Sequence, residues 1–178
     1  VSNTGPYCVG NTISLNATGS GGTSYSWTGP AGFNSTSEDA TRPNALTTHA
    51  GSYSVTLTNT TTTCSTSATT NVTVNANPSV SASNNGPVCA GATLNLNVTG
   101  SGGLGYSWTG PGGYTSSDED PIRTNALTSY SGTYTVVLTN TSTGCTATAT
   151  TSATVNANPT ISASNNGPVC AGSTLNLY

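Results

Sequence analysis

The stretch that decides the fold is SNNGPVCAG, residues 83–91, because the same nine residues return unchanged as residues 164–172. These two copies lie 81 residues apart, and sliding the whole chain by that offset aligns it without a gap at roughly 60% identity. The offset also relates Cys8 to Cys89 and Cys170, Trp27 to Trp108, Cys64 to Cys145, and Pro78 to Pro159. The sequence is therefore a tandem repeat, and we expect it to be an interior piece of a longer protein.

Composition excludes several functional classes. The chain has 178 residues, of which 4% are charged, and its basic residues are two arginines. Such a chain has no basic patch with which to neutralise phosphates, which argues against nucleic-acid binding. It contains no run of about 20 apolar residues, so no membrane-inserted helix is expected. Abundant threonine, valine and tyrosine favour strands, and the sequence predicts an all-β protein.

The repeat unit has the length of a small β-sandwich, since 81 residues exceed the 20–45 residues of a solenoid repeat. Strict alternation places Leu94, Leu96 and Val98 on one face of a predicted strand. We predict a first repeat over residues 1–77 that lacks its first strand, a complete second repeat over 78–158, and the start of a third over 159–178. Four aromatic residues are predicted core anchors: Trp27, Trp108, Tyr53 and Tyr134.

Several motifs carry a resemblance to a known family. They are VCAGATL (88–94), YSWTGPGGY (106–114), SGTYTV (131–136) and the Gly-Cys pair at 144–145, with counterparts in the first repeat. The chain resembles the immunoglobulin-like and PKD-like repeats of large secreted adhesins from gliding bacteria of the Cytophaga–Flavobacterium group. The resemblance implies tandem immunoglobulin-like antiparallel β-sandwich modules, export to the cell surface, and a role as spacers or display units.

Five cysteines at repeat-related positions suggest disulfides and an oxidising compartment. One pairing lies within each module, Cys8 with Cys64 and Cys89 with Cys145. In immunoglobulin topology, however, those partners lie at opposite poles of the sandwich, more than about 20 Å apart. The other pairing is staggered between modules, Cys8 with Cys145, and leaves Cys64, Cys89 and Cys170 free. The sequence leaves both pairings open.

Concentrated charge occurs in two acidic segments, one in each repeat: Glu38 and Asp39, then Asp118, Glu119 and Asp120. Carboxylates of this kind could hold Ca²⁺ at a junction between modules. The alternative is a solvated loop whose acids pair with Arg42 or Arg123. Apart from this weak calcium candidate, no cofactor is expected. The single histidine, His49, is replaced by Tyr130 in the second repeat, so we expect an exposed, variable residue and no metal site there.

Four aromatic residues near turns are candidates for exposed contact with a carbohydrate: Phe33, Tyr114, Tyr25 and Tyr106. No Ser/His/Asp set is repeated, and the carboxylates of one loop do not form the opposed pair of a glycosidase, so no catalysis is expected.

The sequence thus predicts a structural repeat of an extracellular surface adhesin, stalk or filament. One alternative is a carbohydrate- or partner-binding module that acts by avidity. Another is a fibre subunit that exchanges strands between chains. The expected partners are neighbouring repeats, like chains or surface glycans.

Overall fold

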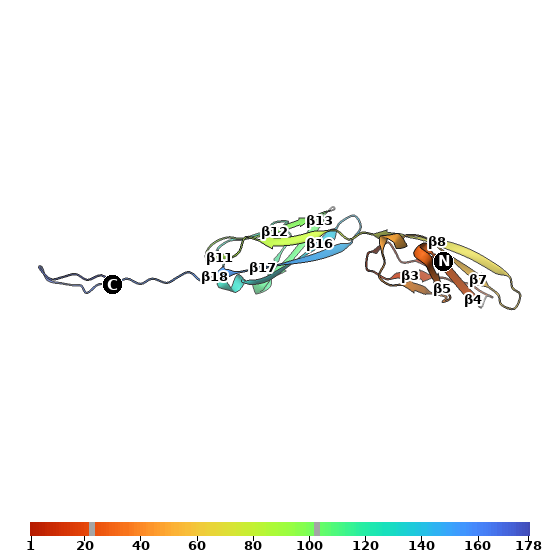
Figure 1. Ribbon diagram of the computed structural model, residues 1–178, viewed down its shortest axis with the longest axis horizontal. Helices are drawn as coiled ribbons and strands as arrows, with labels where there is room; N and C mark the ends of the chain where they lie inside the picture. The colour runs from red at the N-terminus through yellow and green to blue at the C-terminus, as the bar shows by residue number, and fades with distance from the viewer. Residues whose placement is uncertain (22–23, 102–103) are drawn as a thin grey trace.

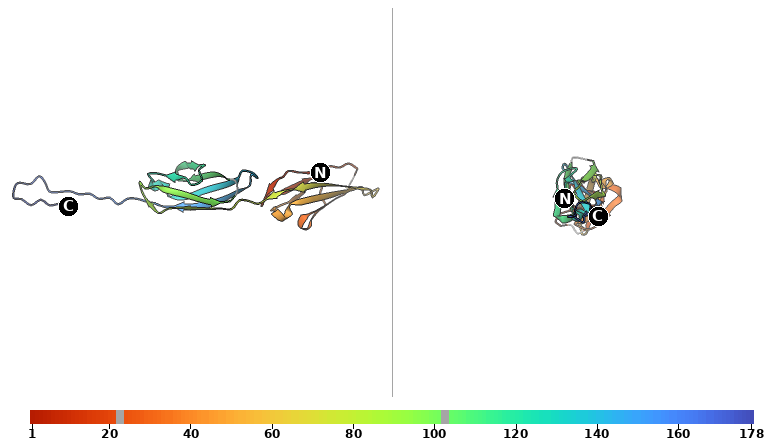
Figure 2. Two further views of the ribbon diagram at one scale, coloured as in Figure 1. Left: turned by 90° about the horizontal axis from the view of Figure 1, so that it is seen from above. Right: turned by 90° about the vertical axis from the view of Figure 1, so that its left-hand side faces the viewer.

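The computed structural model describes residues 1–21, 24–101 and 104–178, and it contains two sandwiches of strands and an extended segment. Figure 1 shows module 1 (β1–β9), module 2 (β10–β18) and the segment that follows residue 158 arranged along one long axis. Figure 2 shows the molecule from above and from one end, and both views show the same end-to-end arrangement.

Module 2 shows the complete pattern of strands. Its strands are β10 Val80–Asn84, β11 Val88–Cys89, β12 Leu94–Gly100, β13 Leu104–Gly110, β14 Tyr114–Ser116, β15 Ile122–Arg123, β16 Gly132–Asn140, β17 Thr146–Ala153 and β18 Val155–Asn156. Strands β10, β12 and β15 form one sheet, and the second sheet has the order β14-β13-β16-β17. All of these neighbours are antiparallel, whereas the short β11 pairs in parallel with β18. The module is a two-layer β-sandwich, and its last strand, β18, pairs with β11 outside the two main sheets.

Module 1 repeats this topology. Its strands are β1 Ser2–Asn3, β2 Tyr7–Cys8, β3 Ile13–Asn16, β4 Ser24–Gly29, β5 Phe33–Ser35, β6 Ala40–Arg42, β7 Gly51–Thr58, β8 Ser65–Val72 and β9 Val74–Asn75. The sequence predicted that the first strand is missing here. That prediction was wrong in part, because Ser2 pairs with Asn16 and Asn3 with Leu15, which gives a first strand of two residues.

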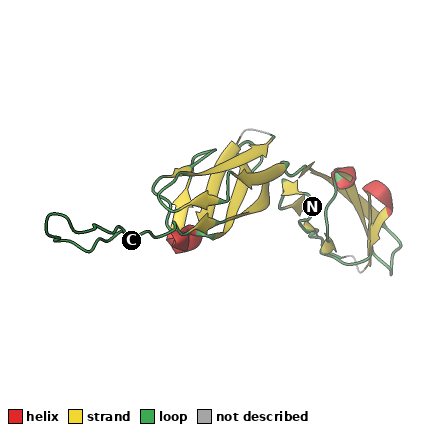
Figure 3. Ribbon diagram, turned by 60° about the vertical axis from the view of Figure 1, so that its left-hand side comes forward, coloured by secondary structure: helices red, strands yellow, loops and turns green. Residues whose placement is uncertain are grey.

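Short 3₁₀ turns connect the strands. They are η1 Pro30–Gly32, η2 Thr47–His49, η3 Pro111–Gly113 and η4 Thr128–Tyr130, and Figure 3 shows them outside the strands of both sandwiches. The segment after residue 158 packs into no core. Its residues are exposed, and a single bridge joins Asn165 to Leu177.

The core follows the alternation of the sequence. Leu94, Leu96 and Val98 on β12 face Tyr134, Val136 and Leu138 on β16, and all six are buried. Trp27 and Trp108 are fully buried, and each indole Nε1–H donates to a loop carbonyl, of Ser37 at 3.0 Å and of Glu119 at 3.2 Å. The four aromatic residues predicted as core anchors are all 0% exposed. A buried indole with a satisfied N–H anchors each sandwich.

Candidate functional site: the junction between the modules

A disulfide joins the two modules. It links Cys8, at the end of β2, to Cys145, which directly precedes β17, and the two Cα atoms are 5.6 Å apart. This separation lies within the usual range for a disulfide. The bond connects residues that are 137 positions apart in the chain, more than one repeat length. The disulfide therefore links one sandwich to the next.

The turn that carries Cys145 is held by Asn140. The Asn140 N–H donates to the Cys145 carbonyl at 2.8 Å, and the Gly144 N–H donates back to the Asn140 carbonyl at 2.8 Å. The Asn140 side-chain oxygen also accepts the N–H groups of Ser142 and Thr143. Gly144 adopts a φ of 73°, a conformation that glycine tolerates without a steric penalty. These bonds give the tip of the β16–β17 hairpin a fixed shape.

The loop that carries Cys8 is equally well determined. Strand β2 pairs in parallel with β9, so Cys8 lies beside Asn75, close to where the chain leaves module 1. Beyond it, the Gly10 N–H donates to the Ala45 carbonyl at 2.8 Å. The side-chain amide of Asn77 donates to the Val9 carbonyl at 3.2 Å, and Pro78, which follows it, is buried. The connection between the modules is therefore short and packed.

The contact around the disulfide is polar but carries no charge. Ser142 and Thr143 of module 2 share a shallow opening with residues of module 1: Asn3, Gly5, Pro6, Asn71, Thr73 and Asn75. Salt screens interactions between charged groups. We therefore expect this junction to keep its geometry over a wide range of ionic strength.

The structure holds one of the two pairings that the sequence left open. Cys8 and Cys145 are bonded to each other, so the pairing within modules is wrong for both residues. The physical reason is that these two poles meet at the junction, whereas the partners within one module lie at opposite ends of its sandwich. Among the described residues, Cys64, Cys89 and Cys170 are free and exposed.

The acidic residues act within their own loops. Asp39 Oδ1 accepts the Ala17 N–H at 3.3 Å, and Asp120 Oδ1 accepts the Val98 N–H at 2.9 Å. Glu38 accepts the Tyr25 hydroxyl at 2.9 Å, whereas Asp118 pairs with the Ser116 hydroxyl. Within the described parts of the chain, no group of three His, Cys, Asp or Glu side chains is close enough to hold a metal ion.

The hydrogen bond to Glu38 is the main cause of a raised pKa of Tyr25, with burial and the charge of Asp39 acting in the same direction. Burial is the main cause of a raised pKa of Tyr106, followed by its hydrogen bond to Glu119. Each phenol therefore loses its proton at a higher pH than an ordinary tyrosine does, and it donates its hydrogen bond to the glutamate up to that pH. The acidic loops brace the ends of their sandwiches.

The two arginines bind at the edge of their own cores. Arg123 Nη1 donates to the Tyr134 hydroxyl at 2.7 Å and to the Pro111 carbonyl at 3.2 Å. Arg42 makes the equivalent bonds to Tyr53 and Pro30. These bonds lend no support to the alternative in which the acidic loops pair with the arginines, because each guanidinium binds a carbonyl and a phenol at the edge of its own core. The sequence indicates only that the two arginines occupy equivalent positions, since they are 81 residues apart.

The aromatic residues predicted to be exposed are half-buried. The Phe33 ring packs edge-on against Tyr53 with centroids 5.3 Å apart, and Tyr114 packs on Tyr134 at 5.7 Å. The Arg123 guanidinium lies 4.4 Å from the Tyr114 ring centroid. Tyr25 and Tyr106 are half-buried as well and pack against their cores. These rings form the outer layer of each core, so each offers only part of its surface to a ligand.

His49 is half-buried, in contrast to the predicted exposed residue. Its Nδ1 accepts the Leu46 N–H at 3.2 Å, and its carbonyl accepts the Tyr53 hydroxyl at 2.9 Å. Burial, followed by the nearby charge of Arg42, lowers the pKa of His49. The imidazole closes a local turn, and Tyr130 takes its place in module 2.

Comparison with known proteins gives a likeness of fold. No protein-family model matches the chain, and no curated protein matches it. Among solved structures it is similar to the N-terminal four Ig domains of Dscam1 isoform 6.9, with a TM-score of 0.35 and 18% identity over 89% of this chain and 43% of that one. Three N-terminal domains of the outer capsid protein Hoc of bacteriophage RB49 give a TM-score of 0.39 and 21% identity, over 84% of this chain and 55% of that one. An amphioxus IgVJ-C2 molecule gives a TM-score of 0.38 and 14% identity, over 86% of this chain and 99% of that one.

These likenesses are too distant to inform on function, and the strand order itself defines the fold. A three-stranded and a four-stranded antiparallel sheet enclose a tryptophan carried by a central strand, as in immunoglobulin domains. Each module is an immunoglobulin-like β-sandwich. This fold typically carries no catalytic site. Within the part of the chain that the structure describes, no helix is long and apolar enough to cross a membrane.

Proposed function

We propose that this chain is a structural segment of an extracellular surface adhesin, a stalk or filament that needs neither catalysis nor a cofactor. The observation that carries the proposal is the position of the disulfide. Cys8 and Cys145 join two modules, whereas a bond within one sandwich would only brace that sandwich. Disulfides persist outside the reducing cytosol, which agrees with display at a cell surface.

The bond also defines how the segment would carry a load. Tension applied at the two ends passes from Cys8 directly to Cys145, so the chain between them is shielded from extension. Because the 137-residue separation exceeds the 81-residue repeat, bonds of this kind in successive modules would overlap along an array. Overlapping disulfides would link each module covalently to the next, so the array would resist stretching.

The surface suits a spacer. Because Tyr53, Val55 and Leu57 point inward, the alternate residues of β7 face outward, and these are serine and threonine. Thr56 on β7 and Ser67 on β8 share a hydrogen bond of 2.9 Å between their hydroxyl groups on this face. A neutral, hydroxyl-bearing surface with two arginines gives trypsin-like proteases few sites. The avidity alternative has less support, because the aromatic rings that could stack on sugars are half-buried in their own modules.

Stretching single molecules tests the proposal. In the oxidised chain held at its ends, only the residues outside the disulfide loop extend, giving about 150 Å at ~3.5 Å per residue. With a reductant present, the whole chain extends to about 620 Å by the same measure. A Cys170→Ser variant is the matched control and should behave as the unmodified chain does. Full extension without reductant would contradict a load-bearing role for the bond.

A further inference from the structure

The junction between the modules carries a row of polar side chains. Val72 and Val74 are buried in module 1. The residues that alternate with them, Asn71, Thr73 and Asn75, face outward and line the opening beside the disulfide. Because side chains on one face of an extended chain repeat every ~6.8 Å, the row is about 13 Å long, which is the length of a short oligosaccharide.

The side chains of this row are available to a ligand, whereas their backbone is fixed. Among the described residues, no group is hydrogen-bonded to the carboxamide of Asn71 or Asn75, or to the hydroxyl of Thr73. The Asn71 carbonyl accepts the side-chain amide of Asn3 at 3.0 Å, and the Thr73 carbonyl accepts the Tyr7 N–H at 3.0 Å. Binding to groups that are already held in place costs less conformational entropy.

Module 2 supplies the facing wall of the opening. Ser142 and Thr143, at the tip of the β16–β17 hairpin, line it together with the row. The bond between Cys8 and Cys145 holds this tip in place, and Cys8 pairs with Asn75 across β2 and β9. The opening has a volume of about 530 Å³, which is large enough for a small ligand. The site is therefore shared between the two modules.

The chemistry of the lining favours a neutral ligand. Among the described residues that line the opening, none is ionisable. A bound anion would need a cationic partner, and a bound divalent cation would need carboxylates. A carboxamide offers an acceptor oxygen and two N–H donors, and a hydroxyl both donates and accepts. Neighbouring hydroxyl groups of a sugar need this combination of donors and acceptors.

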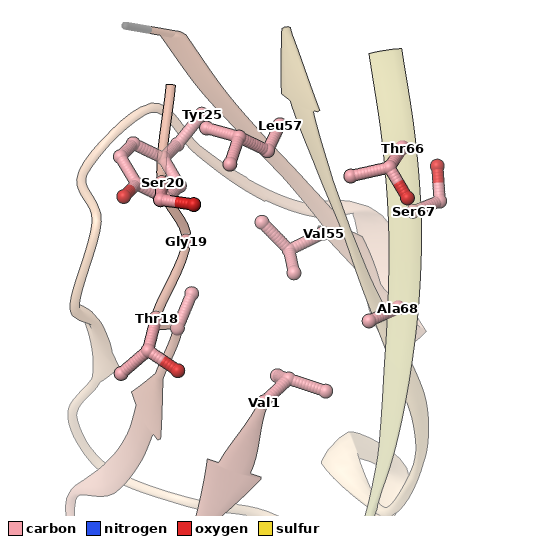
Figure 4. A pocket seen from close by; sticks show the side chains of 11 residues that line it. Val1, Thr18, Gly19, Ser20, Tyr25, Val55, Leu57, Thr66, Ser67 and Ala68 are labelled. Atoms are coloured by element: carbon pink, nitrogen blue, oxygen red, sulfur yellow. The ribbon is translucent and has the colours of Figure 1, made fainter. Parts of the chain in front are cut away.

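A second hollow, within module 1, has a different character. Figure 4 shows Val55 and Leu57 pointing into it, with Ala68 on one side. Sugar hydroxyls placed against these side chains would lose their hydrogen bonds to water without replacement. A polyhydroxylated ligand therefore fits the opening at the junction better than this hollow.

We propose that the opening at the junction binds a neutral sugar segment of a glycan. Asn71, Thr73 and Asn75 bond to its hydroxyl groups along one side, and Ser142 of module 2 bonds to it from the other. The site needs no aromatic ring, because its contacts are hydrogen bonds to amides and hydroxyls. A single site of this kind binds weakly, since each hydrogen bond to the ligand replaces one to water.

The row recurs along the chain. Thr154 and Asn156 occupy the repeat positions of Thr73 and Asn75, and Ser152 replaces Asn71. Successive junctions of an array would therefore present similar rows, and several weak contacts to one glycan would add up by avidity.

An NMR titration of the oxidised, ¹⁵N-labelled chain tests the site. The probes are three neutral trisaccharides, maltotriose, cellotriose and mannotriose, with the anionic trigalacturonate as a comparison. We expect at least one neutral probe to shift the side-chain amide signals of Asn71 and Asn75, and trigalacturonate to leave them unchanged. Asn71→Ala should weaken binding about tenfold, because two hydrogen bonds are lost. Asn97→Ala, at an exposed asparagine on module 2, is the matched control and should bind normally.

Two further variants test whether module 2 takes part. Cys8→Ser releases the hairpin tip and should weaken binding several-fold, whereas Cys170→Ser should not. Ser142→Ala, at an exposed position, gives the same comparison with the disulfide intact. Unchanged affinity in both Cys8→Ser and Ser142→Ala would overturn the shared site.

The inference as a whole fails if no neutral trisaccharide shifts the signals of the row, or if the shifts lie elsewhere in the chain. The load-bearing role is separate, because a chain that binds no sugar can still resist stretching when it is oxidised.

Discussion

Modules 1 and 2 are related in sequence and have the same strand order, yet their equivalent positions differ in how they are covered. Cys145 is 0% exposed and bonded, whereas Cys64 is exposed and free. Strand β12 has seven residues, whereas its counterpart β3 has four. The difference teaches that the surroundings of a hairpin cysteine depend on the adjacent module: Cys145 lies at the junction and is covered, whereas Cys64 lies away from it and is exposed.

The largest expected effect comes from removing the disulfide between the two modules. Cys8→Ser should lower the free energy of unfolding by about 5 kcal/mol if chain entropy alone determines the loss, because the bond closes a 137-residue loop. Guanidinium unfolding under oxidising conditions measures it, with Cys170→Ser as the control. An equal loss in the control would mean that the effect is not specific to the junction.

The connectivity has its own test by proteolysis. After free thiols are alkylated and the chain is denatured without reductant, trypsin should cut after Arg123 but not after Arg42, which precedes Pro43. The two fragments should stay joined until the disulfide is reduced. They should separate in Cys8→Ser but stay joined in Cys89→Ser. Separation in Cys89→Ser would point instead to a bond within module 2.

A second comparison concerns Leu138 and its counterpart Leu57. Leu138→Ala should cost about 3 kcal/mol because this side chain is fully buried, whereas Leu57→Ala should cost about 1 kcal/mol because the Leu57 side chain is only half-buried. Denaturant unfolding of the two variants measures the difference. Equal costs would show that Leu57 is as well covered in solution as Leu138.

A smaller effect is expected at the tips of the two hairpins. Thr63 adopts a φ of 60°, where its counterpart Gly144 has 73°, and a β-branched residue is strained there. Thr63→Gly should therefore stabilise the chain by about 1 kcal/mol, and Gly144→Thr should destabilise it by a similar amount. Thermal unfolding should show a higher melting temperature for Thr63→Gly and a lower one for Gly144→Thr. A change in the same direction for both variants would contradict the strain at Thr63.

The smallest expected effect is a pH dependence that belongs to module 1. Since the pKa of His49 is lowered in the fold, the unfolded chain binds its proton first as the pH falls below about 6.5. Stability from this group is thus present above the unfolded pKa and decreases as the pH falls toward the folded pKa. An NMR titration of the imidazole should give a pKa below that of a model peptide, and His49→Tyr, which copies Tyr130 of module 2, should remove this contribution.

The local structure of each module could be predicted from the sequence. Alternation identified Leu94 and Leu96 as buried, and the repeat placed Trp27 and Trp108 at the same point of two cores. Alternation and aromatic content are readable locally because side chains of a strand point to opposite faces with a period of two. The sequence could not show that Arg42 and Arg123 bind phenols and carbonyls, because that choice depends on residues that approach from other strands.

What the sequence determined by itself is the repeat, the all-β character and the positions of five cysteines in two equivalent sets, Cys8, Cys89 and Cys170 in one and Cys64 and Cys145 in the other. What only the tertiary structure decided is which of those cysteines meet, since positions that are equivalent in the sequence have different surroundings in space. A disulfide needs two Cα atoms within about 7 Å. Only the end-to-end packing of two sandwiches brings Cys8 that close to Cys145 and leaves Cys64 and Cys89 exposed.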